Sequence, residues 1–147
     1  MPTYATNRKA LHEYEILEKF EAGIVLTGRE VKSVRSGGIR LEDAFATVTQ
    51  GEIWLTNAHI SPYRHGGPLG DYDPIRSRKL LLSKKEVLYL SGKRGVSGLT
   101  IVPLKVYTSK SRIKIELGLG RGRKQYDKRE VLKKRSIDRE IRRRLMQ

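Results

Sequence analysis

Apolar and polar residues alternate along several stretches of the chain, and this period of two is typical of half-buried β-strands. The clearest stretch is residues 112–119, in which Ile113, Ile115, Leu117 and Leu119 are the apolar positions. Val102, Leu104 and Val106 alternate in the same way before it, and the polar residues 108–111 lie between the two stretches. The pattern therefore predicts a β-hairpin, and Pro103 indicates an edge or a bulge within it.

Further strands are predicted at residues 14–26, 39–49 and 52–60. Gly51 separates the last two and predicts a second hairpin. The total is about five strands.

Two short helices interrupt the strands, and each begins with a capping box, in which a hydroxyl residue precedes Glu by three positions. Thr27 and Glu30 begin the first helix, residues 28–36, which ends at Gly37 and Gly38. Ser83 and Glu86 begin the second, which is predicted to end near Gly92.

Hairpin-linked strands with a helix inserted before the last pair fit a mainly β protein. The order favours an OB-type Greek-key barrel with short flanking helices over a sandwich or a βαβ sheet. Residues 65–74 are rich in Gly, Pro and Asp and predict a mobile loop. We expect one body over residues 1–120, since 147 residues suit a single domain.

Residues 121–147 predict a separate basic tail. They hold 12 Lys or Arg and 4 Asp or Glu, which gives +8 of the total net charge of +15. Their few aliphatic residues cannot offset the entropy of ordering the segment alone. Ile137, Ile141 and Leu145 form one helical stripe, so we expect a tail that is disordered or, when bound, helical. The glycines of residues 118–122 are interpreted as a flexible hinge before it.

The charge balance limits the classes of partner that the protein could bind. The chain has 31 Lys or Arg against 16 Asp or Glu, which favours a polyanion: RNA, DNA or an anionic membrane. The first residues lack the apolar stretch of a signal peptide, and no run approaches the ~18 apolar residues that span a bilayer. We expect no membrane partner, and the absence of Cys fits a reducing cytoplasm.

No catalytic, metal or cofactor site is predicted, because His12, His59 and His65 are scattered without ligand spacing. A hydrogen-bonded structural role is favoured for His59 over a ligand role. The glycines of residues 118–122 lack the βαβ context of a nucleotide-binding loop.

Several basic residues are candidates for RNA contacts. The first helix carries Arg29, Lys32 and Arg35, and Arg112 and Lys114 occupy the polar face of a strand. Arg76, Arg78 and Lys79 precede the second helix. A solvated charged face and an RNA-binding face both stay open for them. Tyr63, Tyr72, Tyr107 and Tyr126 could stack on bases, although a strand residue such as Tyr107 is more often core.

Asp127 stands among cations in the tail. As an N-cap with Glu130 three positions later, it could begin the tail helix, or it could accept hydrogen bonds from base edges. Capping is favoured.

Five motifs in order resemble the SsrA-binding protein family, also called small protein B (SmpB). They are Asn7-Arg8-Lys9-Ala10, Glu21-Ala22-Gly23-Ile24, Gly28-Arg29-Glu30-Val31-Lys32-Ser33, residues 73–82 (DPIRSRKLLL) and residues 122–129 (GRKQYDKR). The resemblance spans nearly the whole chain. It implies a monomeric OB-type barrel that binds the tRNA-like domain of transfer-messenger RNA and delivers it to stalled ribosomes. It also implies a tail that becomes helical in the vacant mRNA channel of the small subunit.

The resemblance places RNA contacts at Glu30, at Leu81 or its neighbours and at Lys114, and tail function at Gly122, Asp127, Lys128 and Arg129. Together with the motifs and the basic residues named above, these give the full sets that we expect. RNA contacts are expected at Asn7, Arg8, Lys9, Glu30, Lys32, Arg35, Arg78, Lys79, Leu81 and Lys114. Ribosome contacts in the tail are expected at Gly122, Arg123, Lys124, Tyr126, Asp127, Lys128 and Arg129. From the sequence pattern alone, Glu30 is only a helix cap, but a carboxylate on this helix could also accept from base or ribose donors.

A rival hypothesis is a generic single-strand binder or a ribosomal structural protein, and an enzyme is a distant third. A generic binder would show little preference for an elbow-shaped tRNA-like RNA.

Overall fold

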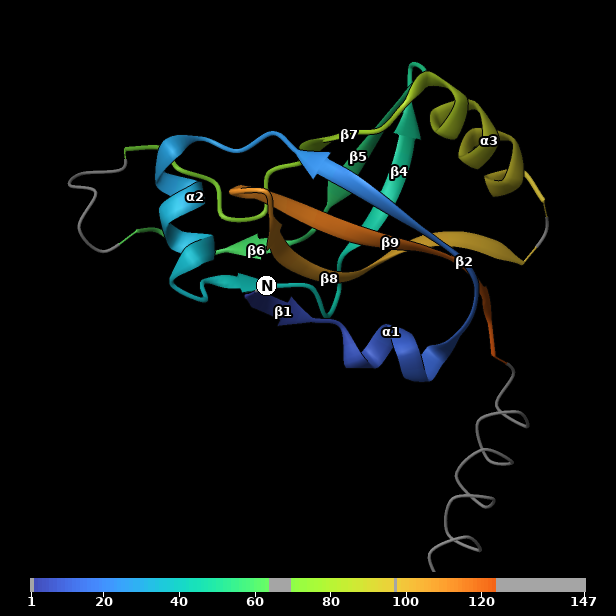
Figure 1. Cartoon of the computed structure of the whole chain (residues 1–147), viewed down its shortest axis with the longest axis horizontal. Coiled ribbons are helices and arrows are strands. Elements are labelled where there is room, and N and C mark those ends of the chain that lie inside the picture. The colour runs from blue at the N-terminus through green and yellow to red at the C-terminus, as the bar shows by residue number, and fades with distance from the viewer. Residues whose placement is uncertain (1, 64–69, 97, 124–147) are drawn as a thin grey trace, which may run out of the picture.

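The computed structural model describes residues 2–63, 70–96 and 98–123 (Figure 1). Its helices are α1 (Arg8–Glu13), α2 (Gly28–Arg35) and α3 (Lys84–Arg94). Its strands are β1 (Thr3–Thr6), β2 (Tyr14–Ile24), β3 (Ile39–Arg40), β4 (Phe45–Thr49), β5 (Glu52–Thr56), β6 (His59–Ile60), β7 (Arg78–Leu81), β8 (Leu99–Ser109) and β9 (Arg112–Gly122).

Seven strands form one antiparallel sheet in the order β1-β8-β9-β2-β7-β5-β4. The sheet curls so that β4, at one end of this order, also contacts β8. β3 and β6 pair separately, and α2 lies beside them at one end of the barrel (Figure 1). The prediction of a mainly β, OB-type barrel with short helices is confirmed.

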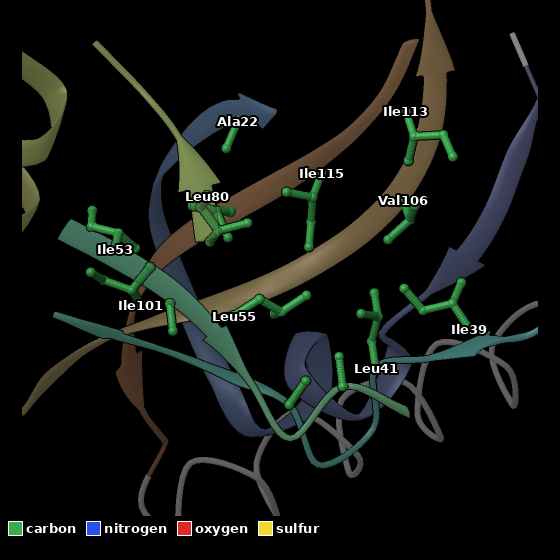
Figure 2. Close-up of a cluster of buried hydrophobic side chains, with 14 of the residues drawn as sticks. Ala22, Ile39, Leu41, Ile53, Leu55, Leu80, Ile101, Val106, Ile113 and Ile115 are labelled. Atoms are coloured by element: carbon green, nitrogen blue, oxygen red, sulfur yellow. The ribbon is translucent and has the colours of Figure 1, made fainter. Parts of the chain in front are cut away.

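The alternating positions supply the core, as predicted. Ile113, Ile115 and Leu117 of β9 point inward toward Ile53 and Leu55 of β5, and all five are buried. Figure 2 shows Ile53, Leu55, Ile113 and Ile115 converging with Leu80 and Ala22 inside the curled sheet. Because side chains alternate in direction along a strand, the polar partners of these residues form the outer face of the barrel.

Both predicted hairpins are present. Lys110 and Ser111 connect β8 to β9 with φ of 50° and 63°, and Gln50 and Gly51 connect β4 to β5 with φ of 52° and 74°. Two consecutive residues with positive φ match the twist of the flanking strands. The predicted irregularity at Pro103 is confirmed by a register shift between Pro103 and Lys105.

The predicted strands at residues 39–49 and 52–60 are each divided in two. The amide of Ala44 donates to the carbonyl of Leu41 in a turn between β3 and β4. Asn57, with φ of 64°, separates β5 from β6. The described residues therefore contain nine strands rather than five, and three elements, β1, α1 and β7, were not predicted.

Both capping boxes are confirmed. Thr27 and Glu30 exchange side-chain to backbone hydrogen bonds at the start of α2, as Ser83 and Glu86 do at the start of α3. α3 ends at Arg94, two residues beyond Gly92, near which the end was predicted, so the helix includes this glycine. A single helical Gly costs only about 1 kcal/mol relative to Ala, and neighbouring helix formers offset this.

The interpretation of residues 118–122 as a flexible hinge is also wrong, since they lie in β9 and pair with β2. A Cβ at Gly118 would lie 2.9 Å from Leu104 Cδ1, and one at Gly120 would lie 3.2 Å from Ile16 Cδ1. These glycines let the Ile16 and Leu104 side chains lie against the strand. Sequence spacing cannot reveal a partner such as Ile16, which is more than 100 residues away from both glycines.

Two further predictions concern the loop at residues 65–74 and the role of His59. Of the predicted mobile loop, residues 65–69 lie outside the described residues, whereas the Tyr72 hydroxyl donates to the Ile60 carbonyl at 2.9 Å. The end of that loop is thus held to β6. His59 lies in β6, but its Nδ1 is buried without a hydrogen-bond partner among the described residues.

None of the described helices is long and apolar enough to cross a membrane. No group of three His, Asp or Glu residues suited to a metal occurs in the described ranges.

The turn after α2 yields a stability prediction. A Cβ at Gly38 would overlap Ser33 Oγ and lie 2.9 Å from the Ser33 carbonyl oxygen. We expect Gly38→Ala to lower the free energy of unfolding by about 1–3 kcal/mol, because the backbone must shift. Gly92→Ala is the matched control: it has open space in α3, and we expect it to stabilise the protein by about 0.5–1 kcal/mol. Urea unfolding of both variants checks this, and a Gly38→Ala variant as stable as wild type would contradict it.

Candidate nucleic-acid interface

A flat area of the outer sheet face lies where β7, β2 and β9 run side by side. The register places Leu81 beside Gly23 and Gly23 beside Lys114. A Cβ at Gly23 would lie 3.3 Å from Leu81 Cβ and 3.7 Å from Lys114 Nζ, so the two side chains flank a strand position without one. Leu81 is 51% exposed. We call Gly23, Leu81 and Lys114 the Gly23 platform.

A cavity of about 310 Å³ adjoins the Gly23 platform and reaches α2. Its apolar lining comes from Ile24, Leu26, Val31 and Ile113. Three cations, Arg35, Arg112 and Lys114, complete it without an acidic side chain. Arg35 Nη2 also donates to the Ser111 carbonyl at 3.2 Å, which ties α2 to the β8–β9 turn. Cations over an apolar floor suit a sugar-phosphate backbone with a base or ribose beneath it.

Polar side chains continue the outer face around the platform. Tyr107 pairs with Lys114 in the platform's own row, and Lys105, Glu116 and Glu21 form the next row. The Tyr107 hydroxyl donates to Glu21 Oε2 at 2.5 Å, and Glu116 lies 3.8 Å from both Lys19 Nζ and Lys105 Nζ. Burial, together with the Glu21 carboxylate, raises the pKa of Tyr107. Tyr107 is only 9% exposed, so the alternative of a core residue holds and its ring is not free to stack. The sequence prediction missed Glu21 as part of this face.

Glu30 and Arg78 form a buried ion pair behind the platform. Glu30 is 1% exposed and Arg78 is 0% exposed. Arg78 Nη2 donates to Glu30 Oε2 at 2.6 Å and Arg78 Nε donates to the same oxygen at 3.0 Å. Arg76, which is partly exposed, donates to Glu30 Oε1. Arg78 also donates to the carbonyls of Ala58 and Pro74, at 2.7 and 3.1 Å, so its buried donors are satisfied.

The ionisation of Glu30 follows from these contacts. Burial alone would raise the pKa of Glu30, because it removes water from the carboxylate. The Thr27 amide and the Arg76 and Arg78 guanidinium groups outweigh burial and hold the pKa below its ordinary value. Glu30 is therefore an ionised anchor that joins α2 to β7.

Asn7 is the third buried residue of the predicted RNA-binding set, at 1% exposure. Its Nδ2 donates to the carbonyls of Leu41 and Pro103, at 3.0 and 2.9 Å, while its Oδ1 accepts from the Ala10 amide. These bonds cap α1 and attach it to β8. Asn7, Glu30 and Arg78 thus offer no surface to a ligand in this conformation and instead hold the elements that do.

The remaining predicted residues lie in four places. Arg35, Leu81 and Lys114 meet at the cavity beside the platform. Lys79 lies on the same sheet face, paired with Glu52 at 3.1 Å, and Lys32 Nζ lies 5.8 Å from the centroid of the Tyr63 ring on α2's side. Arg8 and Lys9 belong to α1, where Lys9 pairs with Asp43 at 3.1 Å and lines a separate cavity.

Only the first two residues of the predicted tail set are described. Gly122 pairs with Tyr14 at the end of β9, and the Arg123 amide donates to the Glu13 carbonyl at 2.8 Å. Both are therefore attached to the body. Lys124, Tyr126, Asp127, Lys128 and Arg129 lie outside the described residues.

Comparisons with known proteins agree over almost the full chain. A family model described as SmpB protein matches residues 4–147. An SsrA-binding protein from a Sulfurihydrogenibium species is 53% identical over 137 residues, 93% of this chain and 90% of that protein. One from Streptococcus mutans serotype c is 52% identical, over 97% of this chain and 92% of that protein.

Similarity to a solved structure extends the agreement to the fold. A chain from "tmRNA-SmpB: a journey to the center of the bacterial ribosome" superposes with a TM-score of 0.69 at 45% identity. The match covers 90% of this chain and 95% of that one.

The buried ion pair yields a stability prediction with a pH dependence. We expect Glu30→Gln to lower the free energy of unfolding at pH 7 by about 3–5 kcal/mol, because it leaves the buried Arg78 charge uncompensated. Glu86→Gln is the matched control, since Glu86 occupies the same capping position on an exposed helix end. Its loss should not exceed about 1 kcal/mol. Urea unfolding measures both.

Acid should erase the difference between wild type and Glu30→Gln. The folded-state pKa of Glu30 is lowered, so its stabilisation is complete above the unfolded-state pKa of about 4.3 and is lost as the pH falls through the folded-state pKa. A difference in unfolding free energy that stays constant from pH 7 to pH 3 would show that the charge of Glu30 is not what holds Arg78.

Proposed function

This chain belongs to the SmpB protein family, and we propose that it binds the tRNA-like domain of transfer-messenger RNA and delivers it to stalled ribosomes for trans-translation. The observation that carries the proposal is the near full-length match to SsrA-binding proteins at 52–53% identity. The solved neighbour, described as tmRNA-SmpB in the bacterial ribosome, supports the same partners.

We assign the binding of the RNA to the body of the protein. The Gly23 platform and the adjoining cavity combine an exposed apolar side chain with three cations, which suits a folded RNA that presents both backbone and sugar or base edges. Leu81, Lys114 and Arg35 are the proposed contacts there, with Lys32 and Lys79 on its borders. Asn7, Glu30 and Arg78 support binding by position, because they fix α1, α2 and β7.

The assignment of Arg8 and Lys9 remains a separate proposal. Both lie on α1, and the cavity that Lys9 lines also includes Glu13, Glu42 and Asp43. Acidic neighbours weaken attraction to phosphate. We therefore place these two cations second to the platform in any RNA affinity.

The tail is assigned the sensing of an empty mRNA channel. Residues 121–147 carry a net charge of +8, and we propose that Gly122, Arg123, Lys124, Tyr126, Asp127, Lys128 and Arg129 contact the small-subunit decoding region and channel. Because Gly122 and Arg123 are bonded to the body, the proposed boundary moves from residue 120 to a point after Arg123. The proposed state is a cytoplasmic monomer that acts by binding and has no catalytic role.

Truncation tests the division between body and tail. Removing residues 124–147 leaves β9 intact, so we expect the affinity for a tRNA-like RNA to be largely retained while peptide tagging on stalled ribosomes is abolished. Gel-shift titration and an in vitro tagging assay measure the two outcomes at one salt concentration. If the shortened protein lost its preference for the tRNA-like RNA over a polypyrimidine strand, the tail would be the specific RNA-binding element and the assignment would be wrong.

Lys114 tests the platform itself. We expect Lys114→Gln to weaken RNA binding and to reduce the slope of log affinity against log salt by about 1, as loss of one phosphate contact does. Lys110→Gln is the matched control, because Lys110 lies in the turn of the same hairpin, is exposed and does not line the cavity. Equal effects of the two substitutions would indicate general charge attraction and exclude a site at the platform.

A further inference from the structure

We propose that Trp54, on the outer face of β5, is a stacking site for an unpaired RNA base and extends the RNA-binding surface beyond the Gly23 platform. The inference rests on the proposed function, since it names a further contact for the same RNA.

The strand register places Trp54 next to the platform. Leu81, Gly23 and Lys114 form one row across β7, β2 and β9. In the neighbouring row, the Val25 amide donates to the Lys79 carbonyl, Lys79 is paired with Trp54, and Trp54 is paired with Thr47. Residues two apart on a strand share a face and lie about 7 Å apart. The Trp54 row and the platform row are therefore adjacent on one continuous outer face.

Burial confirms the direction of the Trp54 side chain. Ile53 and Leu55, its neighbours in β5, are 1% and 0% exposed and point into the core, whereas Trp54 lies on the opposite face and is partly exposed. A large aromatic residue on the solvent side of a central strand leaves apolar surface in water. That surface is the part of the Trp54 row that a ligand could cover.

A depression in the surface gives the ring room to receive a flat ligand. It has a cavity volume of about 310 Å³ and is lined by Thr47, Thr49, Gln50, Glu52, Trp54 and Ser77. Hydroxyl and amide groups in this lining can donate to and accept from base edges. An aromatic ring ringed by small hydrogen-bonding side chains matches the way single-stranded bases are recognised.

The charge around Trp54 favours a base over a phosphate. Lys79 Nζ lies 3.1 Å from Glu52 Oε1, so the cation and the anion nearest the ring compensate each other. Phosphate contacts would instead fall to Lys114 of the platform row and to Arg35 and Arg112 of the adjoining cavity, whose lining has no acidic residue. A strand of RNA crossing both rows would meet cations first and an aromatic ring next.

Tyr89 and Tyr107, two other aromatic residues on the outer side of the barrel, already have partners, unlike Trp54. Tyr89 lies 6.0 Å from the Phe20 ring and 5.5 Å from Lys93 Nζ, and Tyr107 is buried with Glu21. Trp54 has no ring or cation contact within the described ranges. The Trp54 ring is thus partly exposed, and in the described part of the chain neither a ring nor a cation already occupies it.

Intrinsic fluorescence tests the inference directly, because Trp54 is the sole Trp of the chain. The full-length protein is titrated with a transcribed tRNA-like domain of transfer-messenger RNA. We expect stacking to quench the Trp54 emission and to shield the ring from acrylamide. We also expect Trp54→Leu to weaken binding by about 5- to 150-fold, the effect of losing one base stacked on an aromatic ring. Trp54→Phe should retain most of the affinity.

Two controls separate this inference from the function on which it rests. Tyr89→Leu removes an aromatic side chain of 40% exposure away from the platform and should leave RNA affinity unchanged. Lys114→Gln reports whether the platform binds RNA at all. If wild type binds the RNA in a Lys114-dependent way but its emission and acrylamide quenching do not change, the Trp54 inference is overturned and the proposed function stands.

The remaining outcomes are equally decisive. A folded Trp54→Leu variant that binds the RNA as tightly as wild type overturns the inference, even if the emission of the wild-type protein changes on binding. Should Trp54→Leu fail to fold, the wild-type emission and acrylamide measurements decide alone. Wild-type protein that does not bind the tRNA-like RNA overturns the proposed function itself.

Discussion

The buried pair of Glu30 and Arg78 is the constraint on which the proposed RNA-binding side of the molecule depends. A chain with a net charge of +15 has buried an arginine completely, and only a carboxylate with the same degree of burial makes that tolerable. Glu30 lies in the first turn of α2 and Arg78 is the first residue of β7, so one ion pair fixes the wall of the cavity and the strand that carries Leu81. Arg78 further reaches the Ala58 and Pro74 carbonyls, which brings β6 and the end of the neighbouring loop into the same arrangement.

Much of the fold could be predicted from the sequence, because its strongest signals are local. Alternation defined β9, β8 and β2, and hydroxyl and Glu residues three apart defined the starts of α2 and α3. The misses have nonlocal causes. Gly118 and Gly120 were interpreted as a hinge because nothing in the local sequence indicates that the Ile16 side chain packs against them. β7 has only four residues and follows the two polar residues Arg76 and Ser77, so the pattern is too short for a period of two to stand out.

The sequence could predict which residues lie at or near the candidate site, but it could not predict the role of each residue there. Leu81, Lys114 and Arg35 were expected to bind RNA and the structure brings them to one cavity, although that contact remains a proposal. Asn7, Glu30 and Arg78 were placed in the same set, yet each is buried. The type of a polar residue determines which hydrogen bonds its side chain can make, but it does not determine whether the partner is water or a buried protein group. Glu21 and Gly23 were part of a motif, but only the register shows that they neighbour Lys114 and Tyr107.

The pairing of β2 with β9 has a consequence for how the protein is made. It joins residues 14–24 to residues 112–122, near the two ends of the described body. Contacts so distant in sequence form late, because a long loop must close before they are made. During synthesis the edge of β2 that receives β9 therefore stays unpaired until almost the whole body has left the ribosome, and that interval is when the nascent chain is most exposed to misassociation. The barrel closes with its last strand.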